Sequence, residues 1–251
     1  MPSIISSPLI TLSVVSHGNA ETVIALVESV LQYERFDTVQ LIITDNIGEQ
    51  GFREKLPQKA LFFHNHTPRG FAHNHNQAFK YAKGEYFCIL NPDIIFIEPL
   101  FKYLISYIGD GHADIISPLI VDSKNMVQDS FRELPTPTKI LARRLGKKQR
   151  VFVTAKEIFP DWLAGMFLFM RSDTFEQLGG FDERYFLYFE DVDFCTRARL
   201  AGFQLLLESA LKVQHDAHRG SQRSLRYLLW HLHSAVKFFS SETYRKAKRM
   251  A

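Results

Sequence analysis

The sequence predicts an α/β fold, built on a mainly parallel, doubly wound sheet with helices on its faces. Short apolar runs alternate with amphipathic stretches through the first hundred residues, which is the pattern of repeated β-α-β units. Polar residues gather where the apolar runs end, at Ser16-His17-Gly18, Asp45-Asn46 and Asn91-Pro92-Asp93. Because the carboxyl ends of parallel strands share one edge of a sheet, these residues predict a small-molecule site along that edge.

The first part of the chain supplies the elements of this pattern. We expect strands over residues 9–16, 39–44, 61–65 and 85–90, and helices over residues 21–33 and 77–83. A polar loop over residues 67–76 leads into the second helix. Neither a Gly-x-Gly-x-x-Gly fingerprint nor a Walker loop occurs, so neither a dinucleotide fold nor a P-loop is supported.

The regular alternation of predicted strands and helices ends after residue 100. We expect a helix over residues 100–108, a strand over 114–120, a long irregular stretch over 122–160 and a strand over 162–170. A capped helix closed by glycine follows over 172–180, then a helix over 191–202, short strands over 204–207 and 212–214, and an amphipathic helix over 224–239.

Composition narrows the class of protein. With 251 residues and a hydrophobic fraction of 46%, the chain can bury one large domain or two small ones. Cys88 and Cys195 lie in apolar surroundings, which predicts buried free thiols and a reducing, cytoplasmic compartment. We expect neither a secretory signal nor a membrane span, because no apolar run approaches the roughly 18–20 residues that a span requires.

Three carboxylates stand in one of the most aromatic stretches of the chain, residues 186–195. Glu190, Asp191 and Asp193 lie among Phe and Tyr, where ionised groups cost desolvation energy unless a metal, a substrate or a base compensates. A helix N-terminus also favours acidic residues, and there Asp193 would cap the helix or pair with Arg197 four residues on. The two interpretations are compatible, because a helix start is a common place for an exposed catalytic carboxylate.

The net charge of +3 is unevenly distributed. Residues 139–150 carry six basic side chains and no acid, and residues 219–251 carry eight against Glu242 alone. Such asymmetry predicts an anionic partner. A nucleic-acid-binding protein is one hypothesis, but the chain lacks a recognisable reader motif, so we expect no nucleic-acid partner.

Five motifs occur in a fixed order: Leu90-Asn91-Pro92-Asp93, Trp162-Leu163-Ala164-Gly165, Gly179-Gly180-Phe181-Asp182-Glu183, Glu190-Asp191-Val192-Asp193 and Gly202-Phe203. In this order and spacing the chain resembles the inverting family 2 glycosyltransferases, and among them the bacterial rhamnosyltransferase-like branch. The resemblance runs from Ser13 to about Phe239. It implies the GT-A fold, a Rossmann-like twisted sheet. It also implies a glycosyltransferase domain over residues 1–218, with a nucleotide-binding half (1–99), an acceptor half (100–218) and a C-terminal basic helix and tail (219–251).

The resemblance also implies a divalent cation, Mg²⁺ or Mn²⁺, on the nucleotide-sugar diphosphate. Asp93 matches its carboxylate ligand, and Asn91 stands where the usual Asp-x-Asp pattern has its first Asp. His215 stands where a late strand often supplies another ligand. For Asp93 the alternative is a turn-forming Asp after Pro92, and for His215 a structural histidine.

Further roles follow from the same resemblance. Asp191 matches the catalytic base, and Glu190 would position the base or the acceptor. The expected nucleotide-sugar contacts are Ser16, His17, Asp45, Arg69, Gly70, Asn74, Asn76, Asn91 and Asp93; the expected acceptor contacts are Trp162, Gly165 and Glu190. For the glycine and asparagine residues the alternative is turn chemistry, and for Trp162 an ordinary core position.

The resemblance thus implies an enzyme that transfers a sugar from a dTDP- or UDP-sugar donor. The sugar would be rhamnose and the donor dTDP-rhamnose. The acceptor would be a glycan or a lipid-linked glycan in bacterial surface polysaccharide synthesis. The C-terminal helix would place the enzyme peripherally at the inner face of the cell membrane, unless it packs on the domain's own core. Another hypothesis is a catalytically silent glycan- or nucleotide-binding relative. Asn91 supports it, and the intact Glu190-Asp191 pair counts against it.

Overall fold

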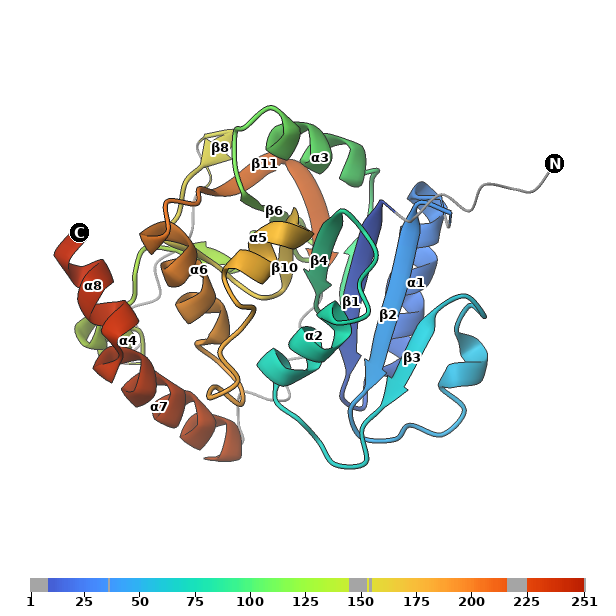
Figure 1. The fold of residues 1–251 in the computed structure, drawn as a ribbon, viewed down its shortest axis with the longest axis horizontal. Coiled ribbons are helices and arrows are strands. Elements are labelled where there is room, and N and C mark those ends of the chain that lie inside the picture. Colours follow the sequence, from blue (N-terminus) through green and yellow to red (C-terminus); the bar gives the residue numbers. More distant parts are fainter. Residues whose placement is uncertain (1–8, 36, 145–152, 154, 216–224, 251) are drawn as a thin grey trace.

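A single twisted sheet of nine strands forms the centre of the molecule (Figure 1). The computed structural model describes residues 9–35, 37–144, 153, 155–215 and 225–250. Along the sheet the strands are β3 (Leu61–His64), β2 (Val39–Asp45), β1 (Ile10–Ser16), β4 (Tyr86–Leu90), β10 (Phe167–Arg171), β6 (Ile115–Val121), β11 (Leu205–His215) and β5 (Ile94–Phe96), with β8 (Glu157–Ile158) on β11. A separate ribbon pairs β7 (Phe131–Arg132) with β9 (Trp162–Leu163).

The mainly parallel sheet is confirmed. The strands β3, β2, β1 and β4 run parallel to one another, and so do β6 and β11. The strand β10 is inserted antiparallel between β4 and β6, and β5 and β8 are antiparallel to β11. Because β4 pairs directly with β10, one sheet runs through both halves of the chain.

Two hydrophobic cores cover the two faces of this sheet. One packs α1 (Ala20–Tyr33) and α3 (Phe101–Gly109) on the sheet, and contains Cys88. The other holds α2 (Phe71–Phe79), α5 (Ser172–Gln177), α6 (Glu190–Leu200), α7 (Leu225–Ser240) and α8 (Glu242–Met250), and contains Cys195. Both cysteines are buried free thiols, as expected.

Several helices and strands have other bounds than the sequence predicts. The helix α2 begins at Phe71, so most of the expected polar loop over 67–76 is helical. The stretch 122–160 contains α4 (Pro137–Arg144) as well as β7 and β8. The predicted strand 162–170 is broken at Gly165 into β9 and β10, while the two short strands after residue 204 form one strand with a bulge between Glu208 and Lys212.

The C-terminal region also folds onto this core. The basic tail that follows α7 forms α8, where Tyr244 and Ala247 are buried together with Phe238 of α7. The alternative expectation of a helix packed on the domain's own core is therefore confirmed for one face of α7. The basic cluster at residues 145–150 lies outside the described residues.

Candidate active site

The register of the parallel strands brings the predicted donor-side residues to one edge of the sheet. Ser16 is level with Asp45 across β1 and β2, and Asp45 is level with His64 across β2 and β3. On the other side of β1, Val14 is level with Leu90, so Asn91 and Asp93 follow at the same edge. The structure therefore brings together strand ends that lie more than seventy residues apart in the sequence.

Asn46 connects these strand ends to the turn before α2. Its side-chain amide donates to the carbonyl oxygen of Arg69 (2.9 Å) and lies 3.1 Å from Nδ1 of His17. Its Oδ1 accepts from the backbone N–H of Arg69 and from Nδ2 of Asn65, both at 2.8 Å. The Arg69 side chain is exposed. The network fixes the turn through the backbone of Arg69 and does not use its guanidinium.

The carboxylate of Asp45 is used within its own loop. It is 2% exposed, and its two oxygens accept the backbone N–H groups of Ile47, Gly48 and Glu49 at 2.7–3.1 Å. In this conformation both carboxylate oxygens accept hydrogen bonds from the backbone of the loop, so Asp45 stabilises the shape of that loop. Direct contact with a nucleobase stays a prediction.

Glu49 is a polar residue at this edge that the sequence analysis did not single out. Its carboxylate accepts the hydroxyl hydrogen of Ser16 and the N–H groups of Asn19 (3.2 Å) and Ala20 (2.9 Å). It therefore caps the N-terminus of α1, where a negative charge is favourable. Glu49 lies thirty residues from this helix start in sequence, so no local pattern could have revealed it.

Two of the expected donor contacts, Asn74 and Asn76, lie in the helix α2 and bind other parts of the protein. Asn76 Nδ2 donates to the carbonyl oxygen of Phe181 (2.8 Å) and its Oδ1 accepts the N–H of the same residue (2.9 Å). Asn74 is 1% exposed, and its Oδ1 accepts from Asn65. Both side chains hold protein segments together in this conformation, and their contact with a nucleotide stays a prediction.

Asp93 and His215 meet because β5 and β11 are antiparallel neighbours. His215 is level with Ile94, and its Nε2 lies 3.1 Å from Asp93 Oδ1. This approach lacks hydrogen-bond geometry, since Oδ1 is buried without a hydrogen-bond partner in the part of the chain that the structure describes. Two ligand atoms at right angles on an octahedral cation, each about 2.1 Å from it, lie about 3 Å apart. The pair therefore fits two adjacent ligands of one divalent cation.

Within the described ranges, no cluster of three or more His, Cys, Asp or Glu residues could hold a metal. A cation at Asp93 would thus need further oxygen ligands from the substrate, which phosphates provide. Asn91 is half-buried on the same turn, where its backbone N–H donates to Met166.

The segment before the acidic motif has an unusual backbone. Tyr188 and Phe189 both have positive φ, +69° and +68°, a conformation that costs non-glycine residues of order 1 kcal/mol and is found mainly where surrounding contacts enforce it. Gly70 lies against this segment, because a Cβ there would stand 2.5 Å from the carbonyl oxygen of Phe186. That oxygen accepts the N–H of Phe71 at 3.0 Å, which ties the segment to the start of α2.

Glu190 and Asp191 open α6 in different surroundings. Asp191 is half-buried, and its carboxylate accepts the N–H groups of Gly165 (3.0 Å) and Val192 (2.8 Å). Glu190 is 5% exposed, and its Oε2 has no partner among the described residues. Burial raises the pKa of both carboxyl groups, and the charge of Asp191 raises the pKa of Glu190 further.

Because their surroundings differ, Asp191 and Glu190 suit different roles. Asp191 is fixed in direction and reachable, as a base must be. Gly165, expected at the acceptor, contributes its backbone N–H to the orientation of Asp191. The structure thus gives Gly165 a positioning contact.

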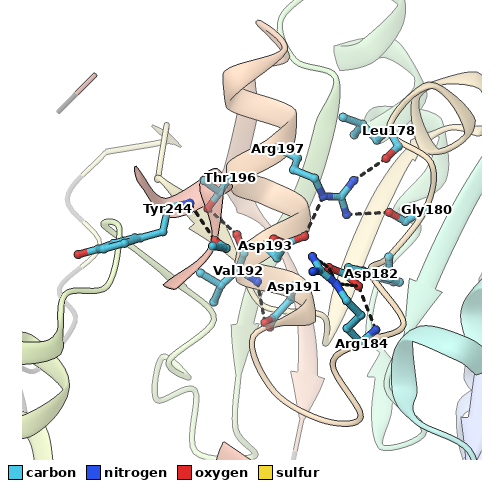
Figure 2. Close-up of polar contacts among 12 residues, drawn as sticks. Leu178, Gly180, Asp182, Arg184, Asp191, Val192, Asp193, Thr196, Arg197 and Tyr244 are labelled. Carbon is cyan, nitrogen blue, oxygen red and sulfur yellow. Dashed lines mark hydrogen bonds and ion pairs between the residues drawn. The ribbon is translucent and has the colours of Figure 1, made fainter. Parts of the chain in front are cut away.

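Asp193 belongs to a separate ion pair with Arg197 of the same helix (Figure 2). Its Oδ2 accepts from Arg197 Nε at 2.8 Å, one helical turn on, and the same guanidinium donates to the carbonyl oxygens of Leu178 and Gly180. Arg197 therefore connects α6 to the turn after α5. This is the pairing expected from the spacing of the two residues.

Trp162 is 9% exposed within the second core, and the guanidinium of Arg132 lies 5.5 Å from the centre of its ring. These contacts favour the alternative of a core tryptophan. Its buried Nε1 has no partner among the residues that the structure describes, so an acceptor contact stays a prediction.

A family model for glycosyl transferase family 2 matches residues 11–175. The chain therefore belongs to this family, and it is a glycosyltransferase. The matched residues include the donor-side edge and Gly165, while Glu190, Asp191 and His215 lie beyond them.

Relatives with curated descriptions point to rhamnosyltransferases. The chain is 26% identical over 248 residues to rhamnosyltransferase WbbL of Escherichia coli K12, covering 92% of this chain and 93% of that one. It is 31% identical over 142 residues to an N-acetylglucosaminyl-diphospho-decaprenol L-rhamnosyltransferase of Mycobacterium tuberculosis, covering 51% of this chain and 46% of that one.

Solved structures confirm the GT-A fold. GalNAc-T7 with UDP, GalNAc and Mn²⁺ superimposes with a TM-score of 0.71 at 15% identity, covering 95% of this chain and 49% of that one. A mannosyltransferase from Pyrobaculum calidifontis with GDP-Man and Mn²⁺ gives a TM-score of 0.59 at 16% identity, covering 96% and 70%. At these identities the likeness is one of fold.

Proposed function

We propose that the protein is an inverting, metal-dependent transferase that moves rhamnose from dTDP-rhamnose, or a sugar from a related dTDP- or UDP-donor, to a glycan or lipid-linked acceptor. The observation that supports it best is the carboxylate of Asp191, half-buried and oriented by the N–H groups of Gly165 and Val192. A module that only binds a glycan has no need of an oriented carboxylate with a raised pKa.

In the proposed reaction the acceptor hydroxyl attacks the anomeric carbon of the donor sugar. The bond from that carbon to the diphosphate oxygen breaks, and the hydroxyl proton passes to Asp191. Attack from the face opposite the departing diphosphate inverts the configuration. The two N–H donors stabilise the ionised carboxylate before the proton arrives, and Glu190, in its buried position, would keep Asp191 turned toward the acceptor.

On the donor side, Asp93 and His215 would hold the Mg²⁺ or Mn²⁺ cation. When bound, that cation neutralises the charge that develops on the diphosphate. Arg69 would contact a phosphate, Gly70 would hold the turn that carries Arg69 against Phe186, and Ser16 and His17 would flank the base. Asp45 would act on the base through the loop it holds. This role also suits a nucleotide-binding half over residues 1–99.

The acceptor and the cellular role are proposed from the same relatives. The name of the mycobacterial relative describes a lipid-linked sugar diphosphate, and we extend that substrate class to this chain, in synthesis of a bacterial surface polysaccharide. Among the described residues, none of the helices combines the length and apolarity that crossing a bilayer would require. Reaching a lipid-linked acceptor would place the enzyme at the inner membrane face by peripheral contact.

A thermal-shift panel tests the donor. The protein is heated with dTDP, UDP, GDP or dTDP-rhamnose, each with and without Mn²⁺. A ligand at 100 times its Kd stabilises by about 2.7 kcal/mol, or several degrees in a domain of this size. We expect a Mn²⁺-dependent shift with the dTDP ligands that is lost in Asp93→Ala and kept in Asp37→Ala, an exposed carboxylate before β2. A nucleotide-induced shift in melting temperature that is the same without Mn²⁺ and in Asp93→Ala contradicts the metal site. No shift with any nucleotide favours the silent-relative hypothesis.

A further inference from the structure

The helix α7 supports the segment that carries the acidic motif. Its Trp230 packs on Phe186 with ring centres 4.8 Å apart, and its His231 packs on Tyr188 and Phe189. Ser234 donates to the carbonyl oxygen of Leu187 at 2.9 Å. These contacts reach the two residues with positive φ, directly before Glu190. One face of α7 therefore holds the backbone that presents Glu190 and Asp191.

Another face of the same helix is apolar and exposed. Five side chains share it at the i, i+3, i+4, i+7 spacing of a helical stripe. They are Leu225 (76% exposed), Leu228 (38%), Leu229 (64%), Leu232 (44%) and Val236 (68%), which we call the α7 stripe. Figure 1 shows α7 at the margin of the molecule, on the side away from β3. A contiguous exposed stripe of this kind marks an interaction surface.

The charged side chains of α7 and α8 are almost all positive. On α7 and α8 the exposed cationic side chains are Arg226, Arg245, Lys246, Lys248 and Arg249, with Lys237 half-buried. Glu242 is the acidic residue among positions 225–250, and it is paired with Lys246 at 2.8 Å. The two C-terminal helices thus combine an exposed apolar row with an excess of cations.

We propose that the α7 stripe docks on the anionic surface of a lipid bilayer. Leucine and valine side chains enter the boundary between head groups and acyl chains, while the arginines and lysines meet anionic head groups. Because the opposite contacts of α7 hold residues 186–189, docking sets the acidic motif at a fixed height beside the bilayer. This inference gives the peripheral contact of the proposed function a specific surface, and it rests on that function only for the acceptor.

Charge favours a lipid surface over a second copy of the chain. Pairing two α7 stripes would bring two cationic flanks together, and like charges across an interface oppose association. An anionic bilayer satisfies the apolar row and the cations at the same time.

Vesicle sedimentation tests the proposal without donor or acceptor. The probes are vesicles of phosphatidylcholine alone, and of phosphatidylcholine with about one third phosphatidylglycerol. We expect the protein to sediment with the anionic vesicles, and less of it as salt rises. The double variant Leu229→Glu with Val236→Glu removes two apolar contacts and adds two anions, so its partition coefficient should fall by about 100-fold.

A matched control keeps the test specific. Tyr103→Glu introduces one anion at an exposed aromatic residue of α3, on a different part of the surface (Figure 1), and should bind vesicles as the unmodified protein does. Circular dichroism and the nucleotide thermal shift should be unchanged in all variants, because the substituted side chains are exposed. A retained nucleotide shift without vesicle binding refutes the docking surface alone, whereas vesicle binding without a nucleotide shift refutes the proposed donor alone.

Three results would overturn the proposal. The first is no sedimentation of the unmodified protein with anionic vesicles at low salt. The second is equal binding by the double variant. The third is a dimer, measured by light scattering, that becomes a monomer in the double variant, because the stripe would then be an interface between copies.

Discussion

The loop that follows β2 at the donor-side edge and the acidic motif differ in how many of their buried polar groups have hydrogen-bond partners. At the donor edge, the side-chain oxygens of Asp45, Asn46 and Glu49 accept hydrogen bonds from backbone N–H groups and neighbouring side chains. Around the acidic motif, Glu190 Oε2 and the hydroxyl of Tyr185 are buried without partners among the described residues. Both regions belong to one continuous sheet and its covering helices.

The difference separates two ways of building a site. A satisfied network holds loops in place before a ligand arrives and stabilises the fold as it does so. Buried carboxyl groups without full compensation cost stability, and in return their pKa values move toward the range useful for proton transfer. Variants at the two regions should therefore affect different quantities.

The largest effect is expected for Asp191→Asn. Loss of the base should lower kcat by about 1,000-fold, while the melting temperature and the donor KM change little. The matched variant at the donor edge, Asp45→Asn, should instead lower the melting temperature and raise the donor KM, because three backbone N–H groups lose ionised acceptors. Steady-state kinetics and calorimetry on both variants measure the contrast. An Asp191→Asn enzyme with full turnover would remove Asp191 from the mechanism.

The second prediction concerns the ion pair that holds α6. Arg197→Met leaves the buried Asp193 and two carbonyl oxygens without their donor, which should lower the free energy of unfolding by about 3 kcal/mol. Arg199→Met removes a more exposed cation of the same helix that pairs with Asp161, and should cost under about 1 kcal/mol. Urea denaturation compares the two variants. Equal losses would show that the Asp193 pair contributes no more than a surface pair.

The smallest effect, and the most specific, is a pH-dependent stabilisation by Glu190→Gln. Burial raises the pKa of Glu190 above its unfolded value, so folding favours the protonated form. That contribution is complete below the unfolded pKa and is lost as pH rises through the folded pKa. Glutamine cannot ionise, and should gain about 1.4 kcal/mol for each unit by which the pKa is raised.

Thermal unfolding from acid to neutral pH measures this difference. Glu190→Gln should match the unmodified protein near the unfolded pKa and be the more stable of the two at neutral pH, although its turnover falls. The exposed control Glu85→Gln should show no such stabilisation with rising pH. A difference that is constant with pH, or largest in acid, would mean that the cost of the charge at Glu190 is compensated.

Local patterns in the sequence are enough to predict the sheet, its mainly parallel strands and the strand-end positions of Ser16, Asp45 and Asp93. These features depend on local signals: apolar runs of strand length, polar residues where the runs end, and glycines that close helices, such as Gly202 with φ of +91°. Local signals also predict the start of α6, from its acidic residues, and the Asp193–Arg197 pair, from the separation of four residues.

Which polar side chains already have hydrogen-bond partners depends on the folded protein and could not be predicted. Asn76 fits a donor loop by composition, yet α2 turns it onto Phe181; Glu49 caps a helix that starts thirty residues earlier. The meeting of Asp93 with His215, and the division of α7 into a supporting face and an exposed stripe, depend on contacts between segments far apart in the chain. Hydrogen bonds and burial act through space, so no local pattern in the sequence carries them.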